Sequence, residues 1–201
     1  MTRLFIIRHG QTHWNVEGRL QGSSDVELNA QGLEQAQRTA LSLVGAVRPD
    51  AVVVSSPLVR ARNTGQAVAD ALGVTLVVDE RITERDYGVW EGLTTEQAHL
   101  HDPEQAAIWQ RGDEPHVEGY ESHELVAARM RSALDEWRAR VPGDIIFATH
   151  GTSGRMLMLN LLGLPTQNHA VGSLENAAWS RLSPGADTPW TLERHNIGAA
   201  N

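Results

Sequence analysis

The residues best suited to chemistry are two histidines that directly follow apolar segments. His9 stands in "RHG" after the apolar residues 4–7, and His150 stands in "THG" after "DIIFA". A neutral imidazole can attack an electrophile, accept a proton or bind a ligand near neutral pH. The glycine after each histidine allows a tight turn or a close approach of the backbone to a ligand. This repeated pattern predicts one site to which two strand ends each bring a histidine.

Arginines and one carboxylate stand in similar places along the chain. Arg8 ends the first apolar segment, and Arg60 follows "AVVVSSP" near the start of a helical segment. The segment "RITERDYG" places Glu84 and Arg85 after a third apolar segment. The planar guanidinium group binds phosphoryl oxygens through paired hydrogen bonds and stays charged. Together with Asn15, these side chains suit a phosphate ester.

Strand and helix patterns alternate along the chain and must position these side chains. Short apolar segments are typical of buried strands, and helical spacing with caps and breakers indicates the helices between them. The predicted strands lie at residues 4–8, 51–56, 74–79, 144–151, 177–183 and 190–196, and the predicted helices at 30–47, 58–73, 122–141 and 154–163. Such alternation predicts an α/β fold, a three-layer α/β/α sandwich with a mostly parallel central sheet. Ligands bind at the carboxyl ends of the strands in such sheets.

The helix that begins after Asn29 carries apolar residues at helical spacing. We expect them to lie on one face of the helix and to point to the core. They are Leu33, Ala36, Ala40, Leu41 and Val44.

The segment at about residues 95–121 has a weak pattern, with short helical pieces among glycine and proline. We expect a lid-like excursion there, within a single domain that spans residues 1–201. Four histidines in or next to this segment are expected to be solvated: His99, His101, His116 and His123.

The composition excludes several classes of function. The formal net charge is −8, whereas a general nucleic-acid binder needs a basic surface. All 17 positive residues are arginines and cysteine is absent, which excludes lysine Schiff bases, lysine-type phosphate loops and thiolate chemistry. The apolar runs at 4–7 and 156–164 are too short or too interrupted for a signal peptide or a membrane span. We therefore expect a cytoplasmic protein that binds neither nucleic acid nor membranes.

Six motifs together resemble those of the histidine phosphatase superfamily, which also contains the cofactor-dependent phosphoglycerate mutases. They are "RHGQTHWN", "GRLQGSSDVELNAQGLEQA", "SSPLVRARNT", "ITERDYGVWEGLT", "GYES" and "THGTSGR". The resemblance runs from residue 4 to at least residue 182 and implies a phosphoglycerate mutase-like sandwich. Where "GGES" is common in the family, this chain has "GYES", and Tyr120 is a candidate for shaping the entrance of the site.

The resemblance also implies roles for individual residues. His9 matches the nucleophile that forms a phosphohistidine, and we expect a backbone carbonyl near Gly10 to hold one of its ring nitrogens. Glu84 matches the proton donor to the leaving alcohol. The implied catalytic residues are His9, Glu84, His150, Arg8 and Arg60. The implied substrate-binding residues are Arg8, Asn15, Gln21, Gly22, Arg60, Arg85, His150 and Gly151, with neither a cofactor nor a metal ion.

A phosphatase acting on small phosphorylated metabolites is the function that we favour, and a homodimer is compatible with it. The main alternative is a cofactor-dependent phosphoglycerate mutase, in which the excursion carries extra basic residues, whereas this excursion offers only Arg111. A metal-dependent hydrolase is another alternative, because His9 and His13 have the spacing of helix ligands. A non-catalytic binder of phosphorylated ligands is a third alternative. It is disfavoured because a protein that only binds needs no nucleophile such as His9 and no proton donor such as Glu84.

Overall fold

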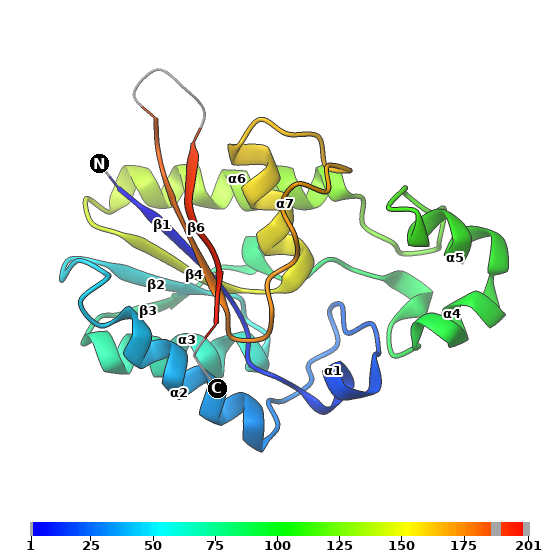
Figure 1. Ribbon diagram of the computed structural model, residues 1–201, viewed down its shortest axis with the longest axis horizontal. Helices are drawn as coiled ribbons and strands as arrows, with labels where there is room; N and C mark the ends of the chain where they lie inside the picture. Colours follow the sequence, from blue (N-terminus) through cyan, green and yellow to red (C-terminus); the bar gives the residue numbers. More distant parts are fainter. Residues whose placement is uncertain (1, 186–189, 199–201) are drawn as a thin grey trace.

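A six-stranded sheet forms the centre of the computed structural model, which describes residues 2–185 and 190–198 (Figure 1). The strand order is β3-β2-β4-β1-β5-β6. The strands are β1 (Leu4–Arg8), β2 (Val52–Ser55), β3 (Leu76–Val78), β4 (Ile145–Thr149), β5 (Trp179–Ser183) and β6 (Thr191–Ile197). Strands β3, β2, β4 and β1 are parallel to one another, and β5 is antiparallel to β1 and β6. The mostly parallel sheet predicted from the sequence is confirmed.

Helices cover both faces of this sheet (Figure 1). On one face lie α6 (His123–Arg140) and α7 (Gly151–Leu161), and on the other lie α2 (Ala30–Leu43) and α3 (Val59–Leu72). The predicted three-layer sandwich is therefore confirmed. No helix within the described residues has the length and the hydropathy to cross a membrane.

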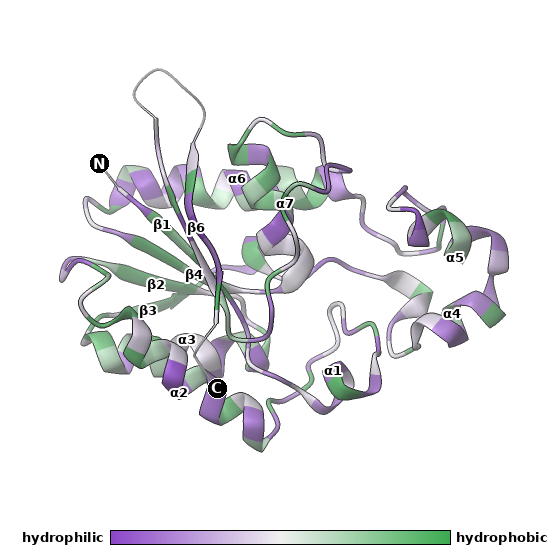
Figure 2. Ribbon diagram, in the orientation of Figure 1, coloured by the Kyte–Doolittle hydropathy of each residue, from purple (hydrophilic) through white to green (hydrophobic). Residues whose placement is uncertain are grey.

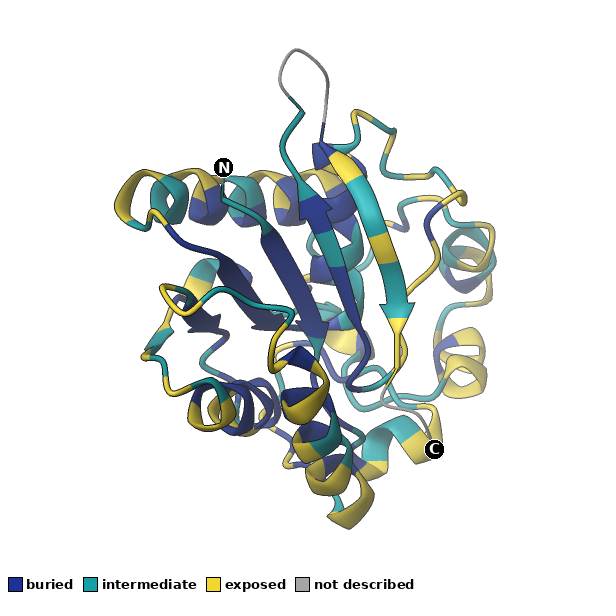
Figure 3. Cartoon of the chain, turned by 60° about the vertical axis from the view of Figure 1, so that its left-hand side comes forward, coloured by how far each residue is buried: buried dark blue, intermediate teal, exposed yellow. Residues whose placement is uncertain are grey.

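Neighbouring residues of the central strands belong to two separate cores. In β1, Leu4 and Ile6 pack in the core under α6 and α7, whereas Phe5 and Ile7 pack in the core under α2 and α3. Successive side chains of a strand point to opposite faces, so both faces of a doubly covered strand need apolar residues. Figure 2 shows the central strands as hydrophobic and Figure 3 shows them as buried. These continuous apolar runs keep the strands in register and bring their carboxyl ends to one edge.

Helix α2 buries only part of the predicted face: Ala36 and Ala40 are buried as expected, but the larger residues of that face are exposed. Its buried residues are Gly32, Ala36, Thr39, Ala40 and Leu43, whereas Leu33, Leu41 and Val44 are 50%, 68% and 55% exposed. The reason is a close approach between backbones: a Cβ atom added at Gly32 would lie 2.0 Å from the carbonyl oxygen of Gln11. Thr39 Oγ1 also donates to the carbonyl of Ala177, at 2.6 Å. Small residues must face inward where α2 approaches Gln11 and Ala177, which turns Leu33 and Leu41 to the surface.

Short elements gather beyond the carboxyl ends of the parallel strands. They are α1 (His13–Glu17), η1 (Glu80–Ile82), η2 (Gly88–Trp90), α4 (Thr95–His101) and α5 (Pro103–Gln110). Figure 1 places α1, α4 and α5 together at that end of the molecule. A small core around Trp90, Ala98 and Ala106 supports α4 and α5. The excursion at about residues 95–121 thus has its own packing beside the edge where we expect the site.

An ion-pair cluster lies where β4 begins, at the edge of the sheet opposite to the carboxyl ends of the parallel strands. The carboxylate of Asp144 is fully buried and accepts hydrogen bonds from Arg3 Nε, at 3.1 Å, and from Arg48 Nη2, at 2.6 Å. Burial acts to raise the pKa of Asp144, but the hydrogen bonds from the two arginines outweigh it and hold that pKa at about 2. The folded state therefore favours the charged carboxylate.

Replacing Asp144 with asparagine should lower the free energy of unfolding at pH 7 by about 3 kcal/mol, the scale of breaking a buried ion pair. A carboxyl whose pKa is depressed on folding stabilises the protein above its unfolded pKa and loses that contribution as the pH falls through its folded pKa. The difference between wild type and variant should therefore shrink between about pH 4 and pH 2. Urea unfolding of wild type and variant at pH 7 and pH 3 measures this difference in the free energy of unfolding. The control is Asp135→Asn, which removes an exposed pair with Arg131; equal losses in both variants would contradict the role of Asp144.

Candidate active site

The two histidines of the sequence motifs meet at the carboxyl ends of neighbouring strands. His9 follows β1 and His150 follows β4, and Arg8 of β1 is paired in register with Thr149 of β4. The ring centroids of His9 and His150 are 5.3 Å apart. Both side chains are buried, with 3% and 0% of their surface exposed. The predicted meeting of two strand-end histidines is present in the structure.

The ring of His9 is held in one orientation and one protonation state. Its Nδ1 lies 2.7 Å from the carbonyl oxygen of Gly10, as the sequence led us to expect. A carbonyl can only accept a hydrogen bond, so Nδ1 carries the hydrogen. Burial, Arg60 and Arg8, in that order, lower the pKa of His9 well below its ordinary value. The imidazole is therefore neutral, with the lone pair on Nε2.

Gly10 is required by the packing that holds this ring. A Cβ atom added at Gly10 would lie 2.3 Å from the carbonyl oxygen of Gly32 in α2. The N–H of Gly10 donates to Thr64 Oγ1 of α3, at 3.0 Å. The backbone at Gly10, whose carbonyl orients His9, therefore packs directly against α2 and α3.

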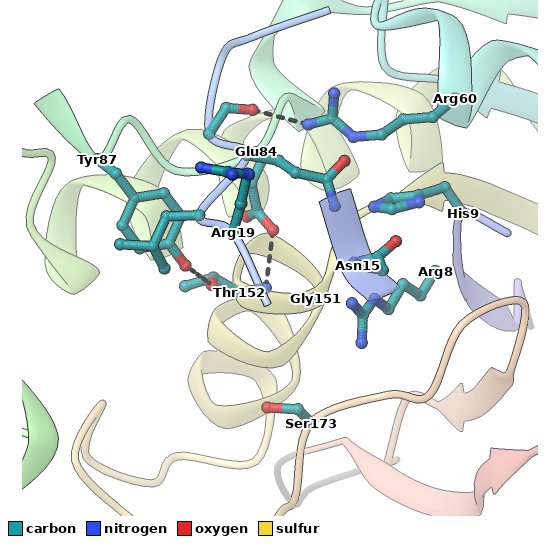
Figure 4. A pocket seen from close by; sticks show the side chains of 13 residues that line it. Arg8, His9, Asn15, Arg19, Arg60, Glu84, Tyr87, Gly151, Thr152 and Ser173 are labelled. Atoms are coloured by element: carbon teal, nitrogen blue, oxygen red, sulfur yellow. Dashed lines mark hydrogen bonds between the residues drawn. The ribbon is translucent and has the colours of Figure 1, made fainter. Parts of the chain in front are cut away.

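Two arginines are fixed by backbone carbonyls around the histidine pair. Arg60 is fully buried and donates from Nη1 to the carbonyl of Ser24, at 2.6 Å, and from Nη2 to that of Gly22, at 2.7 Å. Arg8 donates from Nη1 to the carbonyl of Leu174, at 2.7 Å. Figure 4 shows both guanidinium groups on the side of His9 that faces the pocket.

Three buried nitrogens beside His9 have no hydrogen-bond partner among the described residues. They are Arg8 Nε, Arg60 Nε and His150 Nδ1. His150 Nε2 lies 2.8 Å from Ser56 Oγ, and when that hydroxyl donates, Nδ1 of His150 carries the hydrogen. Burial lowers the pKa of both arginines, yet guanidinium groups remain protonated at neutral pH. Buried donors left unpaired are costly, so this set is arranged for an oxyanion such as a phosphoryl group.

Glu84 stands where the first turn of α7 meets the pocket. Its carboxylate accepts hydrogen bonds from the backbone N–H groups of Arg85, at 2.9 Å, Ser153, at 3.0 Å, and Thr152, at 3.2 Å. The hydroxyl of Ser153 lies 3.1 Å from the same carboxylate and donates to the carbonyl of Thr83, at 2.6 Å. These donors fix the carboxyl group at the rim of the pocket, where Figure 4 shows it.

Asn15 and Gln21 occupy their places through polar contacts with Thr12. Asn15 Oδ1 accepts from the N–H of Thr12, at 3.0 Å, and from Asn176 Nδ2, at 3.1 Å. Thr12 Oγ1 donates to Gln21 Oε1, at 3.1 Å. Because the carbonyl oxygen of Asn15 is engaged, its Nδ2 group is the part that can donate to a ligand.

These groups line a cavity of about 220 Å³. The predicted site residues that line it are Arg8, His9, Asn15, Gln21, Gly22, Arg60, Glu84 and Gly151. His150 lies beside His9 without lining the cavity. Sequence reasoning missed four lining residues, Arg19, Leu20, Thr152 and Ser173. Arg19 and Leu20 lie in the motif "GRLQG", and Thr152 lies in "THGTSGR". Their closeness in sequence to Gln21 and Gly151, which were predicted to bind substrate, could have identified them.

Arg85 is the predicted binding residue that the structure places elsewhere. Its side chain is 1% exposed and points away from the cavity, where it donates to Tyr120 Oη, to Glu114 Oε2 at 3.0 Å and to the carbonyl of Glu121 at 2.9 Å. Tyr120 packs beneath this guanidinium and does not line the cavity at His9. Glu84 lines the cavity, whereas the partners of Arg85 hold its side chain outside the cavity lining.

His123 also differs from its expected position. It is buried at the start of α6, with Nδ1 2.5 Å from Glu114 Oε1. Burial, followed by the charges of Arg85 and Arg155, lowers the pKa of His123 to about 4. The other three histidines of the excursion are exposed as expected: His99, His101 and His116.

The histidine pair with helix-ligand spacing does not come together. His9 is buried in the pocket, whereas His13 is exposed on α1. Within the part of the chain that the structure describes, no group of three histidine, aspartate or glutamate side chains is placed to hold a metal ion.

Comparisons of the sequence extend over nearly the whole chain. The sequence model of the histidine phosphatase superfamily (branch 1) matches residues 4–198. The chain is 35% identical to glucosyl-3-phosphoglycerate phosphatase of Mycobacterium tuberculosis, over 98% of this chain and 95% of that protein. It is 30% identical to a probable phosphoglycerate mutase of Enterobacter sp. (strain 638), over 96% of this chain and 92% of that protein.

Solved structures show the same fold. Mycobacterial glucosyl-3-phosphoglycerate phosphatase in complex with VO3 matches with a TM-score of 0.88 and 34% identity, over 98% of this chain and 100% of that one. A phosphoserine phosphatase mutant from Entamoeba histolytica in complex with phosphoserine matches with a TM-score of 0.84 and 27% identity, over 98% and 97% of the two chains. The similarity thus extends over nearly the whole length of the compared chains.

Proposed function

The chain belongs to branch 1 of the histidine phosphatase superfamily and is a phosphomonoesterase of that family, and from this premise we propose that it hydrolyses small phosphate monoesters through a phosphohistidine on His9. One observation carries the proposal. A neutral His9 ring, with its Nδ1 hydrogen bonded to Gly10, adjoins three buried nitrogens, of Arg8, Arg60 and His150, that no described residue pairs with. Such a set combines a nucleophile with donors for the phosphoryl oxygens.

In the first step, the lone pair on His9 Nε2 attacks phosphorus in line with the leaving oxygen. A nitrogen–phosphorus bond forms and the bond to the leaving oxygen breaks, while protonated Glu84 gives its proton to that oxygen. The alcohol departs, and the donors of Arg8, Arg60 and His150 bind the charged phosphoryl oxygens.

In the second step, water takes the place of the alcohol. The Glu84 carboxylate accepts a proton from the water, whose oxygen attacks phosphorus. The nitrogen–phosphorus bond breaks, its electron pair returns to Nε2, and phosphate is released. His9 is neutral again and Glu84 is protonated, so both groups are ready for the next substrate.

Arg19 supports a substrate that carries a carboxylate besides the phosphate. It lines the cavity on a different segment from Arg8 and Arg60. Its Nε pairs with Glu17 Oε2, at 2.5 Å, and its Nη1 donates to the carbonyl of Gly92, at 2.7 Å, so that Nη2 is the nitrogen that no described residue engages. The phosphoryl group is already supplied with donors, so a third arginine suits a second anionic group. Glucosyl-3-phosphoglycerate and phosphoserine, named for two of the related proteins, both have a carboxylate.

The position of Arg111 favours hydrolysis over mutase chemistry. A mutase must hold a second phosphorylated group, for which the mutases use basic residues of the excursion. Arg111, the one arginine of this excursion, is 63% exposed beside Asp113 and does not line the cavity.

Two matched pairs of phosphate monoesters should test the proposal with the purified enzyme. Phosphoserine and phosphoethanolamine differ by one carboxylate, and 3-phosphoglycerate and glycerol 3-phosphate differ by a carboxylate in place of an alcohol. We expect phosphate release from all four, with kcat/KM about tenfold higher for the carboxylate member of each pair, the scale of one charge-assisted hydrogen bond.

The same assay separates the alternative functions. Isomerisation of 3-phosphoglycerate that outpaces phosphate release would identify a mutase. Activity that EDTA removes and zinc restores would identify a metal hydrolase, and binding of phosphoserine without turnover would identify a non-catalytic binder. For a phosphohistidine enzyme, we expect EDTA to leave all four rates unchanged.

A further inference from the structure

The segment 83–86, which carries Glu84, lies between η1 and η2, and one arginine of α6 donates hydrogen bonds to its backbone. Arg129 donates from Nη1 to the carbonyls of Arg81, at 2.8 Å, and Thr83, at 2.7 Å, and from Nη2 to that of Glu84 itself, at 3.1 Å. A single guanidinium group therefore fixes three peptide groups in and just before this segment.

Glu121 fixes the guanidinium in turn. Its Oε1 accepts from Arg129 Nε, at 2.7 Å, and its Oε2 from Nη2, at 2.8 Å. The N–H of Glu121 donates to the carbonyl of Asp86, at 2.9 Å, on the far side of Glu84. Both side chains of this pair are about one-fifth exposed, at 21% and 20%. Glu121 is the glutamate of "GYES", a motif whose carboxylate has no part in the chemistry described above.

We infer that Arg129, held by Glu121, is a positioning residue that sets the place of the Glu84 carboxyl group for proton transfer. The inference rests on the proposed function, because it needs Glu84 to be the proton donor. Arg129 and Glu121 line a separate groove behind Glu84 and do not line the cavity at His9. Their influence on the reaction therefore passes through the backbone at 83–86. A misplacement of about 1 Å can cost about 10²-fold in rate.

Two substrates with different leaving groups test this role. p-Nitrophenolate leaves without a proton, whereas the serine alkoxide of phosphoserine needs one. The ratio kcat/KM reports steps up to the release of the leaving group and omits the later attack by water. In Arg129→Lys, we expect kcat/KM for phosphoserine to fall by about 10- to 100-fold and that for p-nitrophenyl phosphate to fall by less than about threefold. Arg131→Lys, an exposed position on the same helix, should change neither value.

A double variant separates positioning from a general loss of structure. In a Glu84→Gln background, Arg129→Lys should cause no further loss with phosphoserine, because both changes act on the same proton transfer. Equal losses with the two substrates, or additive losses in the double variant, would overturn the role of Arg129. If Glu84→Gln alone lowers kcat/KM for both substrates equally, the proton-donor role in the proposed function fails, and the inference fails with it. A Tm within a few degrees of wild type should accompany the expected result.

Discussion

Replacement of His9 by alanine should reduce hydrolysis of both p-nitrophenyl phosphate and phosphoserine by about 10⁴-fold or more, as loss of a covalent nucleophile does in other enzymes. The quality of the leaving group should make no difference, because no phosphoenzyme can form without the imidazole. His150 cannot substitute, since its Nε2 is engaged with Ser56 and its ring stands beside the nucleophile. Initial rates with each substrate measure the loss.

The same variant should still bind inorganic phosphate. The donors of Arg8, Arg60 and His150 are held by the backbone and by Ser56, not by His9, so calorimetry should give a Kd for phosphate within about tenfold of wild type. His13→Ala, on the exposed side of α1, is the matched control and should keep full activity. Residual activity of His9→Ala within tenfold of wild type would show that His9 is not the nucleophile.

The strand ends are the part of the site that sequence reasoning predicted best. Continuous apolar runs are typical of strands in the middle of a parallel sheet, which helices cover on both faces, and this places His9 and His150 at one edge. Their adjacency also needs β4 to pair with β1, which is a long-range fact of strand order. The family resemblance supplied the roles that residue types alone left open, and the orientation of His9 by Gly10 then followed from chemistry.

The errors share one physical origin, which is the direction of a side chain. Arg85 follows Glu84 by one position, but Tyr120, Glu114 and Glu121 hold its guanidinium group outside the cavity lining. In α2, helical spacing indicated a stripe whose alanines are buried as predicted, but the closeness of Gly32 to Gln11, just after β1, turned Leu33 and Leu41 outward. Local periodicity cannot detect such contacts, because they join segments distant in sequence. The lid role of residues 95–121, the homodimer and the cytoplasmic location stay predictions.

Replacement of Glu84 by glutamine should separate the two halves of the reaction. An amide cannot give a proton to the leaving alcohol, so kcat/KM for phosphoserine should fall by about 10³-fold, within the usual range for general acid catalysis. For p-nitrophenyl phosphate, kcat/KM should change by less than about tenfold, because its leaving group needs no proton. Glu80→Gln, an exposed glutamate in η1, is the control and should behave as wild type.

The second half of the reaction provides an independent readout in Glu84→Gln. Without a base to activate water, the phosphoenzyme formed from p-nitrophenyl phosphate should persist, so kcat should fall while kcat/KM does not. A burst of p-nitrophenolate should appear, together with an acid-labile and alkali-stable phosphate on His9. Equal losses for both substrates without a phosphoenzyme would assign Glu84 to binding. Only a group that donates a proton in the first step and accepts one in the second produces both changes together.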